Sequence, residues 1–344
     1  MKKSIEWNGD VVRIIDQTEL PGKLVYKDLR TSPEMWEAIK KLRIRGAPAI
    51  GIAGAMGVSL GLTEKNYRDE NELFEELEKV TAYLASVRPT AYNLFWAIER
   101  VKNKALAARG DGPLNVLGTV RAESEMILKE EREMSRKMGE NALPFIADGA
   151  VVLTHCNTGF LATGGIGTAL AGIYAAKEAG RKVKVYSSET RPLLQGARLT
   201  VWELMEEGIE VTLITDNMAA HVMHKKDIDL VLLGADRIAR NGDTANKIGT
   251  YQHALSARAH GIPFYVVVPV STIDTDTANG DEISIEERDP LEILEIRGRR
   301  IAPEGTDVYN PAFDVTPAEL ITAIITDRGV VESPNEKKIM ALCG

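Results

Sequence analysis

Short apolar runs alternate with segments of helical pattern through the second part of the chain. The apolar positions in these runs are continuous rather than alternating, which is typical of strands covered on both faces of a sheet. The runs are AVVLTH, KVKVYSS, EVTLIT, DLVLLGAD and PFYVVVP. Each run but the last is separated from the next by a segment that can form a helix. The pattern therefore predicts a doubly wound, mostly parallel, Rossmann-like α/β domain over residues 146–344.

The first part of the chain, residues 1–145, has the pattern of a mainly helical domain that carries a short β-hairpin. The two hairpin strands are VVRIID and GKLVYKDL, which a turn-like PG separates. Apolar positions at helical spacing occur in SPEMWEAIKKL, NELFEELEKVTAYLASV, AYNLFWAIERVKNKALAA and residues 116–145. We expect Ser32 to be the N-cap of the first of these helices, with Pro33 in its first turn.

Composition limits the kind of partner that this chain can have. Its 344 residues suggest about two domains, and a hydrophobic fraction of 44% is enough to form a core. The formal net charge of -8 argues against nucleic acid as the main partner. An anionic ligand would therefore need a local basic pocket.

The chain contains two cysteines, Cys156 and Cys343. So few cysteines imply no disulfide framework, and a reducing cytosol is the natural compartment. The basic start MKKSIEWNGDVV is not followed by an apolar stretch of signal-peptide length, and no segment has the ~18 apolar residues of a membrane span. We expect a soluble, cytoplasmic protein.

Polar and reactive side chains directly follow the predicted strands. In open parallel sheets, ligands bind beyond the carboxyl ends of the strands, so these positions are the first candidates for a site. They are Cys156, Asn157, Glu189, Thr190, Arg191, Asp216, Asn217, Asp236, Arg237, Ser271 and Thr272.

Cys156 stands in VVLTHCNTGFLATGGIGTALAG, between a predicted strand and a glycine-rich helix start. A helix N-terminus would favour its thiolate, although a lone cysteine is also a common buried core residue. Gly165 and Gly167 nearly match a dinucleotide-binding fingerprint, but Leu170 stands where that fingerprint has Gly or Ala, which disfavours an oxidoreductase. The glycines fit either backbone contacts to an anion or ordinary turns.

Asp236 follows the apolar run in DLVLLGADRIARNGDTANKIGTYQHAL. Burial at the floor of a cleft would raise its pKa and suit it to donate a proton; capping a loop or pairing with Arg237 is the alternative. Asn246 and Lys247 precede a predicted helix. Because a lysine at a helix start opposes the helix dipole, its presence there indicates a phosphate between the two.

Arginines in the N-terminal part fit a phosphate site as well. Arg45 and Gly46 begin a helix of small residues in RIRGAPAIGIAGAMG, and Arg88 lies where another helix ends. An arginine beside open backbone amides binds phosphate, although a surface arginine before a closely packed helix gives the same pattern. The five histidines and two cysteines form no metal-binding motif, so we predict no metal.

Several long, ordered motifs resemble those of the methylthioribose-1-phosphate isomerase family, within the initiation-factor 2B-like superfamily. The resemblance runs from about residue 40 to 330. It is carried by RIRGAPAIGIAGAMG, THCNTGFLATGGIGTAL, ETRPLLQGARLTVWEL, TDNMAAHVM, GADRIARNGDTANKIGTYQHAL, IEERDP and APEGTDVYNPAFDVTPAELITAIITDRG.

The resemblance implies an aldose-ketose isomerase of methionine salvage, a route of amino-acid biosynthesis, with an active site between the two domains. It would convert 5-methylthioribose 1-phosphate into 5-methylthioribulose 1-phosphate, need no metal or organic cofactor, and act as a homodimer. Cys156 and Asp236 would be the catalytic pair. The residues implied to bind substrate and its phosphate are Arg45, Gly46, Ala47, Arg88, Gln195, Asn246 and Lys247.

Three alternatives share the superfamily: isomerases of 5-deoxyribose 1-phosphate, isomerases of ribose 1,5-bisphosphate, and non-catalytic regulatory subunits of the guanine-exchange complex for translation initiation. The cysteine after TH, together with Asp236, favours an enzyme. The sequence departs from the family at Phe160, where a small residue is expected, and at GGIG. These departures concern the pocket for the 5-substituent and leave the reaction type unaffected.

Overall fold

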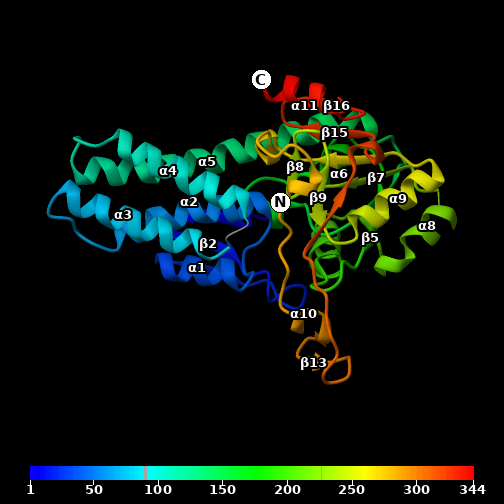
Figure 1. The fold of residues 1–344 in the computed structure, drawn as a ribbon, viewed down its shortest axis with the longest axis horizontal. Coiled ribbons are helices and arrows are strands. Elements are labelled where there is room, and N and C mark those ends of the chain that lie inside the picture. The colour runs from blue at the N-terminus through cyan, green and yellow to red at the C-terminus, as the bar shows by residue number, and fades with distance from the viewer. Residues whose placement is uncertain (89–90, 226) are drawn as a thin grey trace. The chain divides into compact units, whose positions relative to one another are not determined.

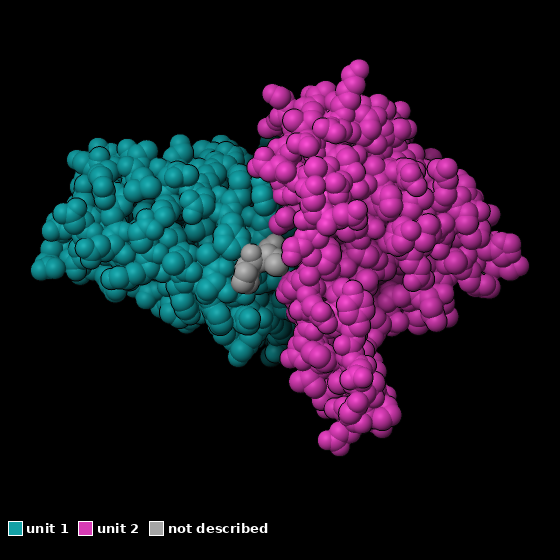
Figure 2. Space-filling model, in the orientation of Figure 1, with its two compact units in different colours: residues 1–136, 159–167 teal, residues 137–158, 168–344 magenta. Residues whose placement is uncertain are grey.

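The computed structural model describes residues 1–88, 91–225 and 227–344. Its contacts divide the chain into two compact units, drawn in different colours in Figure 2. Unit 1 comprises residues 1–136 and 159–167, and unit 2 comprises residues 137–158 and 168–344. The chain therefore leaves unit 2 shortly after Cys156 and returns to it at Thr168. The predicted combination of a helical N-terminal part and an α/β C-terminal part is confirmed.

Unit 1 combines a small antiparallel sheet with five helices, the last of which continues into unit 2. The sheet has three strands, so the sequence missed one beside the predicted hairpin; they are β1 (Ile5–Asn8), β2 (Val11–Ile15) and β3 (Tyr26–Leu29). The helices are α1 (Ser32–Lys40), α2 (Ala47–Thr63), α3 (Glu70–Ala85), α4 (Tyr92–Ala107) and α5 (Pro113–Ala142).

The start of α1 corrects one prediction. Thr31, rather than Ser32, is the N-cap: its side chain accepts from the backbone N–H of Glu34, and the Glu34 side chain accepts from the N–H of Thr31. This reciprocal capping box satisfies two amides that the first turn leaves without helical partners, which is why the helix begins where it does. Ser32 is the first helical residue.

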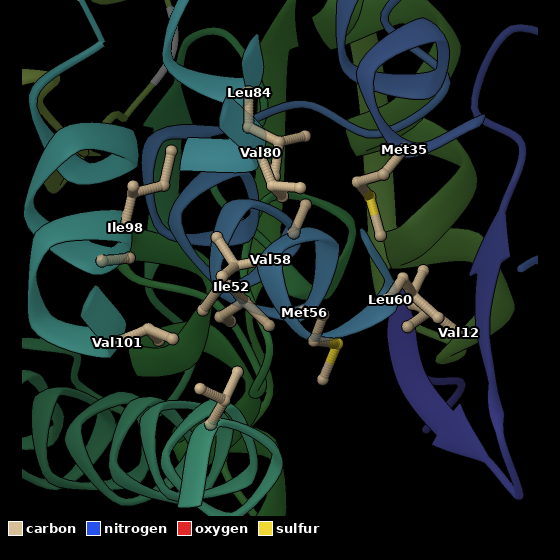
Figure 3. Packing of buried hydrophobic residues seen from close by; sticks show 14 of the residues in the cluster. Val12, Met35, Ile52, Met56, Val58, Leu60, Val80, Leu84, Ile98 and Val101 are labelled. Atoms are coloured by element: carbon tan, nitrogen blue, oxygen red, sulfur yellow. The ribbon is translucent and has the colours of Figure 1, made fainter. Parts of the chain in front are cut away.

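Helix α2 is the centre of the unit 1 core. It consists almost entirely of small and apolar residues and is buried along nearly its whole length. Figure 3 shows its side chains packed against α1, α3 and α4. A Cβ atom at Gly51 would lie 2.9 Å from the Asn93 backbone oxygen in α4, and one at Gly57 would lie 2.9 Å from Met35 Cγ in α1. The glycines therefore set how closely the neighbouring helices approach.

The segment 159–167 packs against α2 and α5 through its own glycines. A Cβ at Gly164 would collide with Ile52 and Leu128, and one at Gly165 would collide with Ser135. The segment's carbonyl groups also accept from side chains of unit 1, such as Gln17 Nε2 on Leu161 O at 2.7 Å. The glycine-rich stretch therefore serves close packing, and the dinucleotide fingerprint that it nearly matches has no structural counterpart here.

Unit 2 is built on a seven-stranded sheet of order β16-β15-β10-β7-β4-β5-β6. All neighbouring pairs are parallel except β15 with β16. The strands are β4 (Val151–Thr154), β5 (Lys184–Ser188), β6 (Glu210–Ile214), β7 (Leu230–Leu233), β10 (Phe264–Val267), β15 (Ala323–Thr326) and β16 (Gly329–Glu332). The five predicted apolar runs form β4, β5, β6, β7 and β10, of which β5 and β7 are labelled in Figure 1.

Helices and a second sheet lie between these strands, and one more helix follows the last strand. The sequence pattern did not predict the second sheet. The helices are α6 (Ala169–Glu178), α7 (Val201–Glu206), α8 (Ala219–Lys225), α9 (Thr250–His260), α10 (Leu291–Leu294) and α11 (Glu336–Cys343). The second sheet has the order β11-β8-β9-β14, with β8 (Arg237–Ala239), β9 (Thr244–Lys247), β11 (Ile273–Asp274) and β14 (Phe313–Thr316). A separate hairpin joins β12 (Glu295–Ile296) to β13 (Arg299–Arg300).

No helix in the described part of the chain combines the length and the apolar character needed to cross a bilayer. The most apolar helix, α2, is instead enclosed by its neighbours in unit 1.

A glycine-to-alanine pair tests the packing of α2. We expect Gly51→Ala to lower the free energy of unfolding by about 1 kcal/mol, because overpacking against the Asn93 carbonyl outweighs the gain in helix propensity. Gly118→Ala, on α5 with no atom within 4 Å of the added carbon, should raise it by about 0.5 to 1 kcal/mol. Thermal unfolding of both variants measures the difference. Equal shifts of the same sign would contradict the packing argument.

Candidate active site

The order of the strands reverses between β4 and β7. From β4 the chain proceeds outward to β5 and β6, and it then returns to place β7 on the other side of β4, parallel to it. Loops leaving the carboxyl ends of two such strands diverge, and the crevice between them is the usual ligand site of an open α/β sheet. Cys156 follows β4 and Asp236 follows β7, so both catalytic candidates lie at this switch point.

The two loops at the switch point contact each other. Gly234, just past the end of β7, lies so close to the loop after β4 that an added Cβ would be 2.8 Å from Thr158 Cγ2 and 3.0 Å from Thr168 Oγ1. Thr158 in turn accepts the backbone N–H of Thr168 at 2.8 Å and that of Leu170 at 3.4 Å. The N–H groups at the start of α6 are thus directed at the carbonyl of Thr158, in the loop after β4 that contains Cys156.

Cys156 has a left-handed backbone, with φ of 62°, and its side chain is buried, with 8% of the residue exposed. A non-glycine residue in this conformation costs about 1 to 3 kcal/mol and persists only when its surroundings fix it. Here the Cys156 N–H donates to Thr190 Oγ1 at 2.9 Å, and Thr200 Oγ1 donates to the Cys156 carbonyl at 2.6 Å. Both polar groups of the cysteine backbone are therefore bound by threonines.

Thr190 is itself strained and firmly held. Its φ is 66°, unusual for a β-branched residue, and it is fully buried. Asp216, after β6, accepts the N–H of Thr190 on Oδ1 and that of Arg191 on Oδ2, each at 2.7 Å. The ends of β4, β5 and β6 are thus joined through hydrogen bonds that orient Cys156.

Asn157, the next residue, reaches a buried carboxylate that sequence reasoning missed. Its Nδ2 donates to Glu203 Oε1 at 2.7 Å, and Tyr174 OH donates to Glu203 Oε2 at 3.2 Å. Glu203 is fully buried in α7. The burial of Tyr174, and to a lesser extent the charge of Glu203, raise the pKa of Tyr174 well above its usual value. A glutamate with polar spacing in a short helix gives no signal of burial, so only the fold could reveal this group.

Asp236 is joined to the substrate-binding candidates of β9. Its N–H donates to Ala245 O at 3.0 Å, which places it beside the strand that contains Asn246 and Lys247. The neighbouring Arg237 forms an ion pair with Asp274 at 3.5 Å.

Asn246 is buried, and its Nδ2 donates to Thr250 Oγ1 at 2.9 Å. Lys247 is half-buried, its Nζ donates to Ala312 O at 3.0 Å, and the same nitrogen lies 4.5 Å from the centre of the Phe313 ring. Both residues belong to β9, where they pair with Asp314 and Phe313 of β14.

The start of α9 corrects the expectation that Lys247 stands at an open helix N-terminus. The helix begins at Thr250, after Gly249 in a left-handed conformation. The carboxylate of Asp314 accepts the N–H of Gly249 at 2.7 Å and that of Tyr251 at 3.1 Å. The chain therefore supplies its own anion to the helix dipole. Burial raises the pKa of Asp314 to about 6, despite the two amides and the nearby Lys247, which favour its ionised form.

Gln195 lies in the connection after β5, at the start of the π-helix Gly196–Thr200 that also contributes Thr200. It is buried, with 5% exposed, and within the described residues its Oε1 has no hydrogen-bond partner. A Cβ on Gly196 would collide with the backbone oxygen of Ser188, so only glycine allows this connection to lie so close to β5. A buried amide oxygen left open in this way is suited to a ligand hydroxyl.

The predicted site residues are divided between the two units. Unit 1 contains Arg45, Gly46, Ala47 and Arg88, and unit 2 contains Cys156, Gln195, Asp236, Asn246 and Lys247. Within unit 1, Gly46 is the N-cap of α2, has a φ of 95°, and lies against Ala162 in the segment that follows Cys156. Arg88 precedes α4 and accepts the N–H of Ala91 on its carbonyl at 3.1 Å.

The first turns of α2 and α4 are neighbours. Gly51 contacts Asn93, and Gly54 contacts Leu94 and Ile98, so the two helices run in the same sense. Arg45 and Arg88 therefore lie at the same end of this helix pair, where the positive ends of both dipoles favour an anion.

Metal binding has no candidate in residues 1–88, 91–225 and 227–344, because no group of three or more His, Cys, Asp and Glu side chains there could hold an ion.

The chain is similar to known proteins over most of its length. A model of the initiation factor 2 subunit family matches residues 43–333. A 5-deoxyribose 1-phosphate isomerase of Moorella thermoacetica is 53% identical over 335 residues, covering 97% of this chain and 95% of that protein. A methylthioribose-1-phosphate isomerase of Geotalea uraniireducens is 51% identical over 342 residues, 99% of each chain.

A solved structure is similar over nearly the whole chain. It is that of 5-methylthioribose 1-phosphate isomerase from Pyrococcus horikoshii, with a TM-score of 0.94 and 41% identity, covering 99% of this chain and 96% of that one.

The raised pKa of Asp314 predicts a pH dependence of stability. Between pH 4 and 6 the folded protein retains a proton on Asp314 that the unfolded chain releases, so this group's contribution to the free energy of unfolding falls as pH rises through that window. The loss should reach up to about 3 kcal/mol at pH 7. In Asp314→Asn this slope disappears, so the difference between wild type and variant should change with pH. Urea unfolding at several pH values measures it, and a constant difference would contradict the assignment.

Proposed function

The chain belongs to the initiation factor 2 subunit family, and on that premise we propose that it is an aldose-ketose isomerase of methionine salvage. Its reaction converts 5-methylthio-D-ribose 1-phosphate into 5-methylthio-D-ribulose 1-phosphate. The observation that carries the proposal is the position of Cys156 and Asp236 directly after β4 and β7, the neighbouring strands between which the strand order of the described sheet reverses. Relatives with isomerase names over nearly the full chain support it.

The substrate explains why an acid is needed. Its phosphate is attached to the anomeric carbon, so the sugar has no free aldehyde form and the ring must open with the phosphate in place. In the proposed reaction the Asp236 carboxyl protonates the ring oxygen as the bond between that oxygen and C1 breaks. Positive charge that develops at C1 would be stabilised by the neighbouring phosphate oxygen and by the site's dipoles.

Hydrogen then moves from C2 to C1, and two routes balance. In one, a base removes the C2 proton to form an enolate-like (enediol) intermediate, which takes up a proton at C1 while the C2 hydroxyl loses its proton and becomes the ketone. In the other, the C2 hydrogen moves to C1 with its electron pair, while the C2 hydroxyl loses its proton and becomes the ketone. Cys156 serves as the base in the first route, as thiolate, and as a polar stabiliser in the second.

The substrate phosphate needs cationic side chains and backbone amides. We assign to it Arg45 and Arg88, which precede α2 and α4, together with Lys247 and the backbone at Gly46 and Ala47. Gln195 and Asn246 offer amide groups to the sugar hydroxyls.

A second candidate substrate is 5-deoxyribose 1-phosphate, because a relative of that name is 53% identical to the chain. The two sugars share the phosphate and the reacting carbons and differ only at C5, so the same catalytic pair would serve both. We associate the preference between these two substrates with the buried Phe160, in the segment after Cys156. A ribose 1,5-bisphosphate substrate would instead need a second basic cluster.

We also propose that the enzyme is a cytoplasmic homodimer. Both cysteines are free thiols, which is typical of a reducing compartment. The homodimer follows from the resemblance to the isomerase family, and size-exclusion chromatography with light scattering tests it.

Turnover on three substrates tests the function. We expect purified protein to act on 5-methylthioribose 1-phosphate in preference to 5-deoxyribose 1-phosphate and ribose 1,5-bisphosphate. Cys156→Ser and Asp236→Asn should each lower turnover by about 100-fold or more, since each removes a group acting at the reacting atoms. Cys343→Ser, which alters the other thiol, should retain wild-type turnover. Absence of activity on all three sugars would favour a regulatory binding protein of the same family.

Arg88→Ala tests the phosphate assignment. Loss of one charge-assisted hydrogen bond costs about 1.5 to 3 kcal/mol, so KM should rise by roughly 10- to 100-fold with a smaller effect on kcat. Arg68→Ala is the matched control, because its side chain is 88% exposed and pairs only locally with Glu72. Steady-state kinetics give both constants, and an unchanged KM in Arg88→Ala would remove Arg88 from the site.

A further inference from the structure

His155, the residue before Cys156, is fully buried and has hydrogen bonds at both ring nitrogens. Its Nδ1 lies 2.6 Å from Ser188 Oγ at the end of β5. Its Nε2 lies 2.9 Å from the carbonyl oxygen of Ile248, the residue after Lys247. One imidazole thus connects the cysteine loop with the end of the strand that holds Asn246 and Lys247.

The partners determine the tautomer. A carbonyl can only accept, so the hydrogen is on Nε2, and Nδ1 accepts from the Ser188 hydroxyl. The ring is neutral because burial lowers the pKa of His155 well below its usual value, and His253 and Lys247 act in the same direction. The His253 ring lies 4.6 Å away, centre to centre, and Asp216 Oδ1 is 3.8 Å from Nδ1, too far for a hydrogen bond.

The turn after Lys247 is shaped around this ring. Gly249 has a φ of 102°, and a Cβ there would lie 3.3 Å from both Cε1 and Nε2 of His155. The same glycine donates its N–H to Asp314, so the turn is fixed from the β14 side as well. The ring therefore occupies a space in which the backbone of residues 248–249 allows little variation.

We propose that His155 is a positioning residue, which sets the distance between Cys156 and the Asn246–Lys247 end of β9 through its Nε2–H bond to the Ile248 carbonyl. This inference rests on the proposed function, because it matters only if Cys156 acts on a sugar that Asn246 and Lys247 hold. Each end of the bond lies one residue from a group of the site, so a shift of the ring moves the reacting and the holding groups relative to each other. Misplacement of about 1 Å can cost about 100-fold in rate.

Two substitutions separate the two hydrogen bonds. The amide of His155→Gln reaches the position of Nε2 and can donate to Ile248 O, but it loses Ser188. The shorter amide of His155→Asn can accept from Ser188 at the position of Nδ1, but it loses Ile248. Ser188→Ala, the matched control, removes the Ser188 contact and leaves His155 in place.

We expect kcat for 5-methylthioribose 1-phosphate to fall by about 10- to 100-fold in His155→Asn, with KM within about threefold of wild type, because alignment at the reacting carbons is lost while the phosphate contacts remain. His155→Gln and Ser188→Ala should each keep at least about a third of the wild-type kcat. The pH profile of kcat should keep its shape in all three variants, since the ring transfers no proton. Gly249→Ala, which leaves His155 intact and pushes against its ring, should show the same loss of kcat as His155→Asn.

Equal kcat in the Gln and Asn variants, a loss confined to KM, or a changed pH profile would overturn the proposal. A purely structural role would instead lower the melting temperature and the active fraction of both variants together. If His155→Asn does not fold, Gly249→Ala and His155→Gln still decide the question. Cys156→Ser, assayed in parallel, distinguishes failure of the proposed function from failure of the role of His155. Full activity of Cys156→Ser refutes the proposed function. An inactive Cys156→Ser, together with equal kcat in His155→Gln and His155→Asn, refutes only the role of His155.

Discussion

The reversal of strand order between β4 and β7 is the constraint on which the site depends. β4 and β7 are parallel neighbours whose connections lead in opposite directions, and in open α/β sheets the carboxyl ends of such a pair are the usual place for a ligand. Cys156 and Asp236 follow these two strands. Their relative position is therefore fixed by the hydrogen-bond register of the sheet, which is a more rigid support than a single loop could provide.

Strain and buried polarity are concentrated around the same point. Cys156 and Thr190 both have left-handed backbones, and Glu203 and His155 are fully buried. Each feature opposes stability when taken alone, since strained residues and desolvated polar groups cost free energy. Each of these residues nevertheless has a specific hydrogen bond within unit 2, and together these bonds fix the orientation of Cys156. This concentration supports the proposed role of Cys156 over that of an ordinary buried cysteine, which the sequence alone also allowed.

Much of the fold could be read from the sequence because its signals are local. Continuous apolar runs predicted β4, β5, β6, β7 and β10, and helical spacing predicted the long helices of unit 1. The second sheet gave no such signal: its strands are short, and β9 pairs with β14 across more than sixty residues of chain, as in Asn246 with Asp314. The strand β1 and the Thr31 cap are local features that the sequence analysis missed, since β1 pairs with the adjacent β2 and Thr31 has the capping-box spacing to Glu34.

The same distinction explains the site. Strand ends pointed to Cys156, Asp236 and Thr190 because the carboxyl edge of a parallel sheet is implied by strand order. Thr200, which binds the Cys156 carbonyl, and Glu203, which binds Asn157, come from other parts of the chain and carry no pattern. Lys247 shows the opposite case. Its position just before a predicted helix suggested that a ligand phosphate lies there. Instead, Asp314 in β14, far along the chain, supplies the negative charge at the start of α9. A ligand phosphate at Lys247 would therefore be bound chiefly by the lysine side chain itself, since the amides of Gly249 and Tyr251 at the start of α9 already donate to Asp314.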